Sequence, residues 1–166
     1  MTSQNLLGPC PSPRVRTICN RPRYARRNTR YLKTMNFEIE KTDEQWLAEL
    51  GPERFHVLRQ AGTEAPFTGD LLHVNAVGDY SCAACNQVLF TNEDKFDAHC
   101  GWPSFDKCEP STIIERSDTS LSRERTEILC ARCGGHLGHV FNDGPTATGL
   151  RYCVNSLSIA FQESDD

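Results

Sequence analysis

The first 35 residues contain no aspartate or glutamate, although the 166-residue chain holds 22 acidic residues in all. The same segment has eight Lys and Arg residues, four prolines and no sustained apolar period. We therefore expect residues 1–35 to be a disordered basic extension and residues 36–166 to form one domain. An Arg-rich leader without acids is typical of a transit peptide for a mitochondrion or plastid. A plain flexible tail, or a true start at Met35, is the alternative, and it leads us to expect a cytoplasmic protein.

Long hydrophobic runs are also missing. No stretch approaches the roughly eighteen consecutive apolar residues of a membrane-spanning helix, and the N-terminus lacks the apolar core of a secretory signal, which argues against export. Residues 36–166 hold ten Lys and Arg against 22 acids, a net charge of about −12. Nucleic-acid binding needs clustered cations instead. The sequence thus predicts neither a membrane nor a nucleic-acid partner.

The predicted domain opens with helix signals and continues with strand signals. Thr42 starts a capping-box pattern, Gly51-Pro52 should end that helix and open a second one, and Gly62 should stop the second. The expected apolar faces of these helices comprise Trp46, Leu47, Leu50, Phe55, Leu58 and Ala61. Downstream, seven short β-favouring runs lie between turn residues: LLHV, DYSC, VLF, STIIER, TEILC, LRYCV and LSIAF. The predicted fold class is mainly β, with short N-terminal helices before an antiparallel β domain.

Four of the nine cysteines form two CxxC pairs, Cys82-Ala-Ala-Cys85 and Cys130-Ala-Arg-Cys133. Each pair follows a strand-like run and precedes turn residues, so two such turns can complete a tetrahedral zinc site. Redox motifs or disulfides are the alternatives, but a redox CxxC usually starts a helix. The 44 residues between the pairs exceed the spacing of a zinc ribbon, so a β excursion must return to the same ion. We predict one structural Zn²⁺ that stabilises folding and has no open position for catalysis.

Two further motifs contain residues suited to substrate binding. In CGGHLGHVFNDGP, His136 and His139 either converge on one pocket as proton donors or are structural or surface residues. In CGWPSF, Trp102 either plugs the interior or forms an apolar wall for a small group such as a methyl. The residues alone leave both alternatives open.

Cys153 stands alone in the segment GLRYCVNS. Residues two apart on a strand face the same way, so Arg151 and Asn155 should share its face. A nearby guanidinium favours the reactive thiolate. A buried core cysteine between Tyr152 and Val154 is the equal alternative.

Five segments together resemble the B-type methionine sulfoxide reductases in order and spacing. They are GTEAPFTG (62–69), YSCAAC (80–85), KFDAHCGWPSF (95–105), RTEILCARCGGHLGHVFNDGP (125–145) and TGLRYCVNS (148–156). The resemblance spans roughly residues 60–161. It implies two antiparallel sheets, with a four-cysteine zinc site away from the catalytic thiol. It also implies reduction of the R epimer of methionine sulfoxide, in proteins or free, and hence protein repair under oxidative stress.

The resemblance implies a role for each matching residue. Cys153 would be the nucleophile that becomes a sulfenic acid, and Cys100 would resolve it as a disulfide for a thioredoxin-type reductant. The implied pocket residues are His139 and His136 as acids, Asn155, Arg151 near the thiolate, and Trp102 against the substrate methyl. The implied zinc ligands are Cys82, Cys85, Cys130 and Cys133. We expect a monomer.

Some residues lie outside the family pattern. His99 stands beside Cys100 where the family commonly has glycine, so the recycling loop could move differently. Cys108 is either a spare thiol or an alternative resolver, and Cys10 and Cys19 are interpreted as incidental. A non-enzymatic zinc module that binds a protein partner and a thiol peroxidase remain the competing functions.

Overall fold

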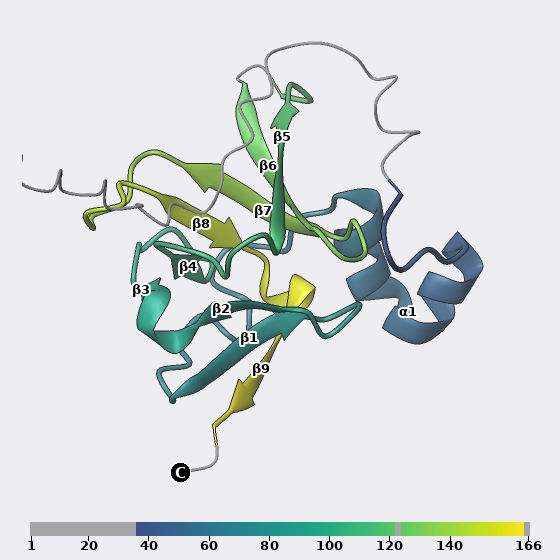
Figure 1. Ribbon diagram of the computed structural model, residues 1–166, viewed down its shortest axis with the longest axis horizontal. Helices are drawn as coiled ribbons and strands as arrows, with labels where there is room; N and C mark the ends of the chain where they lie inside the picture. The colour runs from purple at the N-terminus through teal and green to yellow at the C-terminus, as the bar shows by residue number, and fades with distance from the viewer. Residues whose placement is uncertain (1–35, 122–123, 165–166) are drawn as a thin grey trace, which may run out of the picture.

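The computed structural model describes residues 36–121 and 124–164 (Figure 1). The predicted basic extension, residues 1–35 with Cys10 and Cys19, lies outside the described residues. In the described part, the elements in chain order are α1 (Asp43–Gln60), β1 (Gly78–Cys82), β2 (Val88–Thr91), η2 (Asn92–Asp94), β3 (Lys95–Phe96), β4 (Ser104–Phe105), β5 (Ile113–Asp118), β6 (Arg125–Cys130), β7 (His136–Phe141), β8 (Arg151–Val154), η3 (Ser156–Ser158) and β9 (Ile159–Glu163).

The strands form two antiparallel sheets. One is three-stranded with the order β2-β1-β9, and the other is six-stranded with the order β3-β4-β8-β7-β6-β5. Figure 1 shows α1 at one side of both sheets, and its contacts are with β7 and η3. The prediction of a mainly β fold with two antiparallel sheets is confirmed.

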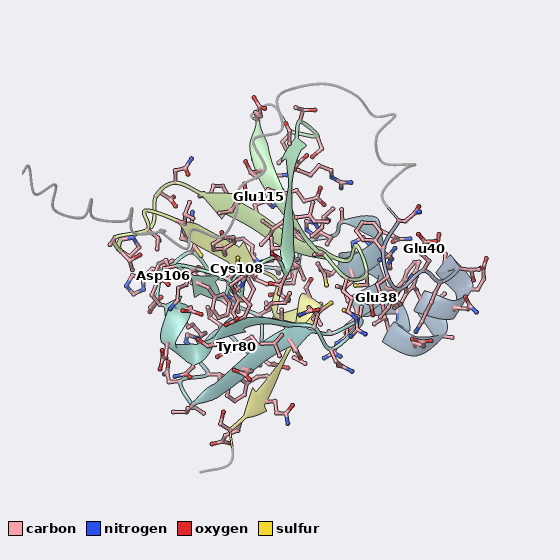
Figure 2. All side chains as sticks on the ribbon, in the orientation of Figure 1. Glu38, Glu40, Tyr80, Asp106, Cys108 and Glu115 are labelled. Atoms are coloured by element: carbon pink, nitrogen blue, oxygen red, sulfur yellow. The ribbon has the colours of Figure 1, made fainter. Side chains whose placement is uncertain are left out.

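Aromatic side chains from both sheets form the centre of the core. Tyr80 and Phe90 of the small sheet meet Phe105 and Tyr152 of the large sheet. The rings of Phe90 and Phe105 stack with centroids 4.2 Å apart, and all four side chains are at most 1% exposed. Figure 2 labels Tyr80, which lies on β1 of the small sheet. Burial of each such ring stabilises the fold by about 1.5–3 kcal/mol.

The ends and the break of α1 follow largely from local sequence. Thr42 and Gln45 form the predicted capping box. Gly51 leaves the helical conformation (φ 71°, ψ 169°), so α1 consists of two helical segments divided where the break was predicted. The C-terminal end differs by one residue, because Ala61 adopts the left-handed conformation (φ 53°) in place of Gly62.

The apolar face of α1 was predicted with two errors, Leu47 and Ala61, and Ala61 is an exposed residue just beyond the end of the helix. Trp46, Phe55 and Leu58 are buried as expected. Leu47 is 45% exposed, because it lies about 100° around the helix from Trp46 and away from the sheets. Within residues 36–121 and 124–164, no helix has both the length and the apolar character needed to cross a membrane.

Six of the seven predicted β runs overlap strands, and LLHV at residues 71–74 does not. That run is a turn, in which Leu72 N donates to Gly69 O. The carbonyls of Leu72 and Val74 accept hydrogen bonds from Lys95 Nζ at 2.9 and 2.8 Å, so a side chain replaces strand pairing. The strands β3, β4 and β7 were not predicted, since two are very short and β7 lies in a glycine-rich run that hides its alternation.

Candidate active site and metal centre

The two CxxC segments form matching turns at the ends of strands from different sheets. Cys82 ends β1 and Cys130 ends β6. Asn86 N donates to Cys82 O at 2.8 Å, and Gly134 N donates to Cys130 O at 2.9 Å. Asn86 (φ 59°) and Gly134 (φ 71°) are both left-handed, which asparagine and glycine tolerate. A Cβ at Gly134 would also lie 2.5 Å from the Phe37 ring, so this position requires glycine.

The four cysteine sulfurs are arranged as a tetrahedral ion would hold them. Cys82, Cys85, Cys130 and Cys133 are buried free thiols, and their Sγ atoms all lie within 4.8 Å of one another. The Sγ atoms of Cys82 and Cys133 are 3.7 Å apart, and those of Cys85 and Cys130 are 3.5 Å apart. Tetrahedral Zn–S bonds of about 2.3 Å place sulfurs about 3.8 Å apart. The predicted convergence of both pairs is confirmed, and the donor set fits zinc.

A row of cross-strand neighbours crosses one face of the six-stranded sheet at Cys153. Residues directly opposite in antiparallel strands present their side chains to the same face. Cys153 on β8 lies opposite Ser104 on β4 and His139 on β7. The full row comprises Phe96, Ser104, Cys153, His139, Glu127 and Arg116, one residue from each strand. The adjacent row, with Phe105 and Tyr152, faces the core, so the Cys153 row lies on the opposite face.

His136 shares the face of His139 because β7 contains a bulge. Residues three apart on a regular strand would point to opposite faces. A register shift between Ile128 and Leu129 of β6 leaves Leu137 as an extra, unpaired residue on β7. This extra residue brings the side chain of His136 to the same face of the sheet as that of His139. The two imidazole rings consequently lie with centroids 5.7 Å apart.

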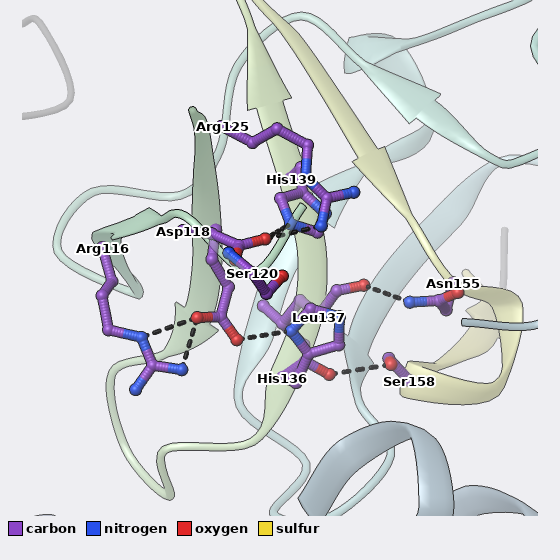
Figure 3. Close-up of polar contacts among 10 residues, drawn as sticks. Arg116, Asp118, Ser120, Arg125, His136, Leu137, His139, Asn155 and Ser158 are labelled. Carbon is purple, nitrogen blue, oxygen red and sulfur yellow. Dashed lines mark hydrogen bonds and ion pairs between the residues drawn. The ribbon is translucent and has the colours of Figure 1, made fainter. Parts of the chain in front are cut away.

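The bulge is supported from both neighbouring segments. A Cβ on Gly138 would lie 2.0 Å from a carbonyl oxygen of β8, so only glycine lets β7 approach β8 here. The Leu137 carbonyl accepts from Asn155 N at 2.9 Å and from Asn155 Nδ2 at 3.2 Å. Ser158 Oγ donates to His136 O at 2.9 Å (Figure 3). Asn155 therefore supports the backbone of the histidine strand.

His136 is held by a chain of two charged side chains (Figure 3). His136 Nδ1 donates to Glu127 Oε1 at 2.7 Å, and Glu127 Oε2 accepts from Arg116 Nε at 2.6 Å. Burial raises the pKa of Glu127, but the interactions with His136 and Arg116 outweigh it and the net shift is downward. His136 Nε2 is buried and has no hydrogen-bond partner among the described residues. A buried nitrogen left free in this way is available to a ligand.

His139 is held in the same manner from β5. His139 Nε2 donates to Asp118 Oδ2 at 2.8 Å, and the same oxygen accepts from Arg125 Nη2 at 2.6 Å. Hydrogen bonds from Ser120, His139 and Arg125 hold the pKa of Asp118 well below its usual range. Burial lowers the pKa of His139, and Asp118 opposes that shift. With Nε2 engaged, Nδ1 is the ring nitrogen left for a ligand.

Cys100 and Cys153 come together from distant parts of the chain. Their Sγ atoms are 3.9 Å apart, although the residues are 53 positions apart in sequence. Cys100 Sγ also lies 3.4 Å from Ser104 Oγ and 3.5 Å from Trp102 O. Both cysteines are partly exposed free thiols. A disulfide needs sulfurs about 2.05 Å apart, so a small movement would join them.

The two thiols titrate as a pair. Contact with Cys153 lowers the pKa of Cys100 to about 5. The same contact, followed by burial, raises the pKa of Cys153, whereas Arg151 lowers it. Their contact therefore favours a single negative charge on the pair. Transfer of a proton from Cys153 to Cys100 makes Cys153 the thiolate.

Arg151 is anchored beside the thiol pair. Its Nε and Nη2 donate to the two carboxylate oxygens of Asp143 at 2.9 and 2.8 Å. The guanidinium also lies 4.5 Å from the centroid of the Phe141 ring. This two-point contact keeps a positive charge close enough to lower the pKa of Cys153.

Trp102 is half-buried and forms part of a cavity wall. Its Nε1 donates to Glu64 O at 3.2 Å. Trp102, Phe96 and Ser104 line a cavity of about 230 Å³ that extends to Lys95. Trp102 is therefore not a fully buried plug, but neither Cys153 nor His139 lines this cavity, so the role of Trp102 as an apolar wall stays a prediction.

Two residues outside the family pattern, His99 and Cys108, differ in their exposure to solvent. His99 is exposed and left-handed (φ 51°), and its backbone N donates to Asp97 Oδ1 at 2.8 Å. Glycine adopts such a φ more readily, which fits the glycine that the resemblance implies at this position. Cys108 belongs to the buried core cluster (Figure 2), so Cys100 is the thiol that the fold brings to Cys153.

Sequence reasoning missed four polar residues of the site: Asp118, Glu127, Ser158 and Glu64. One signal was present for Glu127, because an acidic residue inside the apolar run TEILC needs a buried partner. Asp118 and Ser158 had no such signal, since their partners come from other strands.

Comparison with known proteins gives matches that include the residues of this site. The SelR domain family model matches residues 50–163. The chain is 53% identical over 130 residues to the peptide methionine sulfoxide reductase MsrB of Leptospira interrogans, covering 78% of this chain and 99% of the relative. It is 51% identical to the MsrB of Agrobacterium fabrum over 126 residues, covering 75% of this chain and 93% of the relative. For the MsrB of Methanosarcina mazei, the identity is 49% over 130 residues, covering 78% and 93%.

These similarities span the strands that carry the paired thiols, the two imidazoles and the four-cysteine cluster. The matched region covers most of the chain and nearly the whole length of each relative. The chain therefore belongs to the SelR-domain family of peptide methionine sulfoxide reductases, MsrB.

Proposed function

We propose that this protein reduces the R epimer of methionine sulfoxide in oxidised proteins, and so repairs them. The observation that carries the proposal is the contact of Cys153 with Cys100, with Sγ atoms 3.9 Å apart, opposite the anchored imidazole of His139. A thiol beside both a proton donor and a second thiol can attack an electrophilic sulfur and then be regenerated.

The first step is attack of Cys153 Sγ on the sulfoxide sulfur. Cys153 passes its proton to Cys100, and Arg151 favours the resulting thiolate. The sulfoxide oxygen needs a proton as its bond to sulfur weakens, which we assign to His139, with His136 beside it. The oxygen is transferred to Cys153, which is oxidised to a sulfenic acid while methionine is released in reduced form.

The second step regenerates the thiol. Cys100 Sγ attacks the sulfenic acid, a disulfide forms between the two cysteines, and water leaves. A thioredoxin-type dithiol then reduces this disulfide by exchange, which restores both thiols and oxidises the donor. The partial exposure of Cys100 and Cys153 supports access by such a partner.

Selectivity for the R epimer would arise from the two sides of Cys153. Phe96 and Trp102 supply aromatic surface on the β3–β4 side, whereas His139 and His136 supply ring nitrogens on the β7 side. The methyl group belongs on the first side and the oxygen on the second. The S epimer exchanges these two groups and places the oxygen against aromatic carbon.

We infer that Cys82, Cys85, Cys130 and Cys133 hold one Zn²⁺. The bound ion would fix the end of β1 to the end of β6 and thereby join the two sheets. Four thiolates complete its coordination, so it would supply stability and no chemistry.

An assay with separated epimers tests the function. The full-length protein with dithiothreitol should reduce N-acetylmethionine R-sulfoxide and leave the S-sulfoxide unchanged, and Cys153→Ser should be inactive. Failure to reduce either epimer, with the fold intact, would leave the zinc-module alternative. Faster consumption of hydrogen peroxide than of sulfoxide would favour the thiol peroxidase.

A further inference from the structure

Glu64 uses every one of its polar groups to connect separate parts of the site. Its backbone N donates to Asn155 Oδ1 at 3.2 Å, and its backbone O accepts from Trp102 Nε1 at 3.2 Å. Its carboxylate accepts from Ser156 N at 2.6 Å and from Leu157 N at 3.0 Å. One residue thus contacts both the aromatic wall and the segment that follows β8.

The carboxylate of Glu64 completes the start of η3. The N-cap residue Asn155 makes no side-chain cap hydrogen bond to this helix, so the first N–H groups depend on Glu64. An anion is favoured at such an end because free N–H groups there point outward. A Cβ on Gly69 would lie 2.7 Å from Glu64 Oε1, so a glycine leaves room for the carboxylate.

The loop that carries Glu64 also meets the segment of the second thiol. Phe67 N donates to Gly101 O at 2.8 Å, next to Cys100 in sequence. Phe67 is left-handed at φ 66°, a strained conformation for a bulky residue that neighbouring contacts must maintain. The loop of residues 62–69 is therefore held on two sides by the site.

We propose that Glu64 is a positioning residue that fixes Trp102 relative to Cys153, an inference that rests on the proposed function. The carboxylate of Glu64 accepts from the backbone N–H groups of the two residues that follow Asn155. The backbone carbonyl of Glu64 accepts from the indole N–H of Trp102. Loss of the carboxylate releases the loop, so the indole loses its fixed place while Cys153 stays in β8. The methyl side of the pocket then becomes less defined.

Steady-state kinetics with both epimers test this role. Glu64→Ala should lower kcat/KM for the R-sulfoxide by about 10- to 100-fold, mainly through a higher KM, and should reduce the preference for R over S. Glu64→Gln should be intermediate, because it keeps one acceptor oxygen but replaces the other with an NH2 group that cannot accept from an N–H, and it removes the charge. Glu53→Ala is the matched control, since Glu53 is exposed and lines the same surface groove as Glu64.

A second readout separates positioning from loss of structure. The rate at which iodoacetamide alkylates Cys153 should stay within about twofold of wild type in Glu64→Ala, because β8 keeps its pairing. A large fall in both the alkylation rate and the melting temperature would show a general structural role and overturn the proposal.

A double-mutant cycle with Trp102→Phe gives the decisive comparison. Phenylalanine lacks the indole N–H, so this variant breaks the contact with Glu64 O. If Glu64 acts through Trp102, the fold-loss in kcat/KM of the double variant should be clearly smaller than the product of the fold-losses of the two single variants. Fold-losses that simply multiply would overturn the proposal. If Glu64→Ala does not fold, the same cycle is measured with Glu64→Gln in its place. An inactive wild type would instead refute the proposed function itself.

Discussion

His139 lies directly opposite Cys153 across the β7–β8 pair, and its Nε2 is bonded to Asp118 Oδ2 at 2.8 Å. A ladder of backbone hydrogen bonds, rather than a mobile loop, therefore sets the position of the imidazole beside the thiol. The carboxylate then sets which ring nitrogen carries the proton. Changes at Asp118 should alter the chemistry of His139 without moving its backbone.

Asp118→Asn should shift the pH dependence of turnover. Asp118 raises the pKa of His139, so its removal should lower that pKa and reduce the protonated fraction at any given pH. The falling limb of kcat against pH should move to lower pH, with roughly tenfold or greater loss at neutral pH. Asp79→Asn, at an exposed aspartate of β1 in the other sheet, is the control, and an unmoved limb in Asp118→Asn would exclude His139 as the acid.

The same carboxylate should make stability depend on pH. The pKa of Asp118 is lowered from its usual 3.8, so the folded state favours the ionised form. Its stabilising contribution should be complete above about pH 4 and decline as the pH falls toward the folded-state pKa. The melting temperatures of wild type and Asp118→Asn should thus differ most at neutral pH and converge in acid. A constant difference across this range would contradict the assignment.

Cys100→Ser should separate one turnover from many. The variant retains Cys153 and should reduce about one equivalent of sulfoxide, but thioredoxin-supported cycling should be lost because no disulfide can form. The amount of methionine formed in the initial burst measures the single turnover, and the rate of methionine formation in the steady state measures cycling. Cys108→Ser is the control, since that thiol lies in the core. Continued cycling of Cys100→Ser would show that Cys108 or direct reduction resolves the sulfenic acid.

Cys100→Ser should also lower the pKa of Cys153. Contact with Cys100 is the largest cause that raises this pKa, and Arg151 still lowers it in the variant. Alkylation of Cys153, followed by mass spectrometry over a range of pH, should therefore show a midpoint at lower pH than in wild type. A midpoint that rises would mean that the pair does not share its charge as described.

Cys133→Ser should cost both metal binding and folding. Three remaining thiolates bind zinc far less tightly, and the link between the two sheets is weakened. We expect the bound zinc to fall below one equivalent and the melting temperature to drop by roughly 10 °C or more. Treatment of the wild type with a chelator should reproduce the drop. An unchanged melting temperature in zinc-free Cys133→Ser would exclude the structural role.

Local patterns in the sequence were sufficient for the parts of the fold that depend on near neighbours. The capping box at Thr42, the break at Gly51 and the CxxC turns all involve contacts within a few residues. Six strand runs could be found from β propensity alone. The resemblance of the five motifs then supplied the family, which the comparisons confirm.

Tertiary structure decided which of these pieces act together. The bulge at Leu137 turns His136 to the face of His139, and a propensity pattern contains no information about strand register. The carboxylates of Asp118 and Glu127 join the site through cross-strand pairing. The approach of Cys100 to Cys153 and the contacts of Glu64 likewise join distant segments. Sequence by itself determined the reactive groups, and packing of the two sheets determined their partners, because only folding brings residues far apart in the chain within bonding distance.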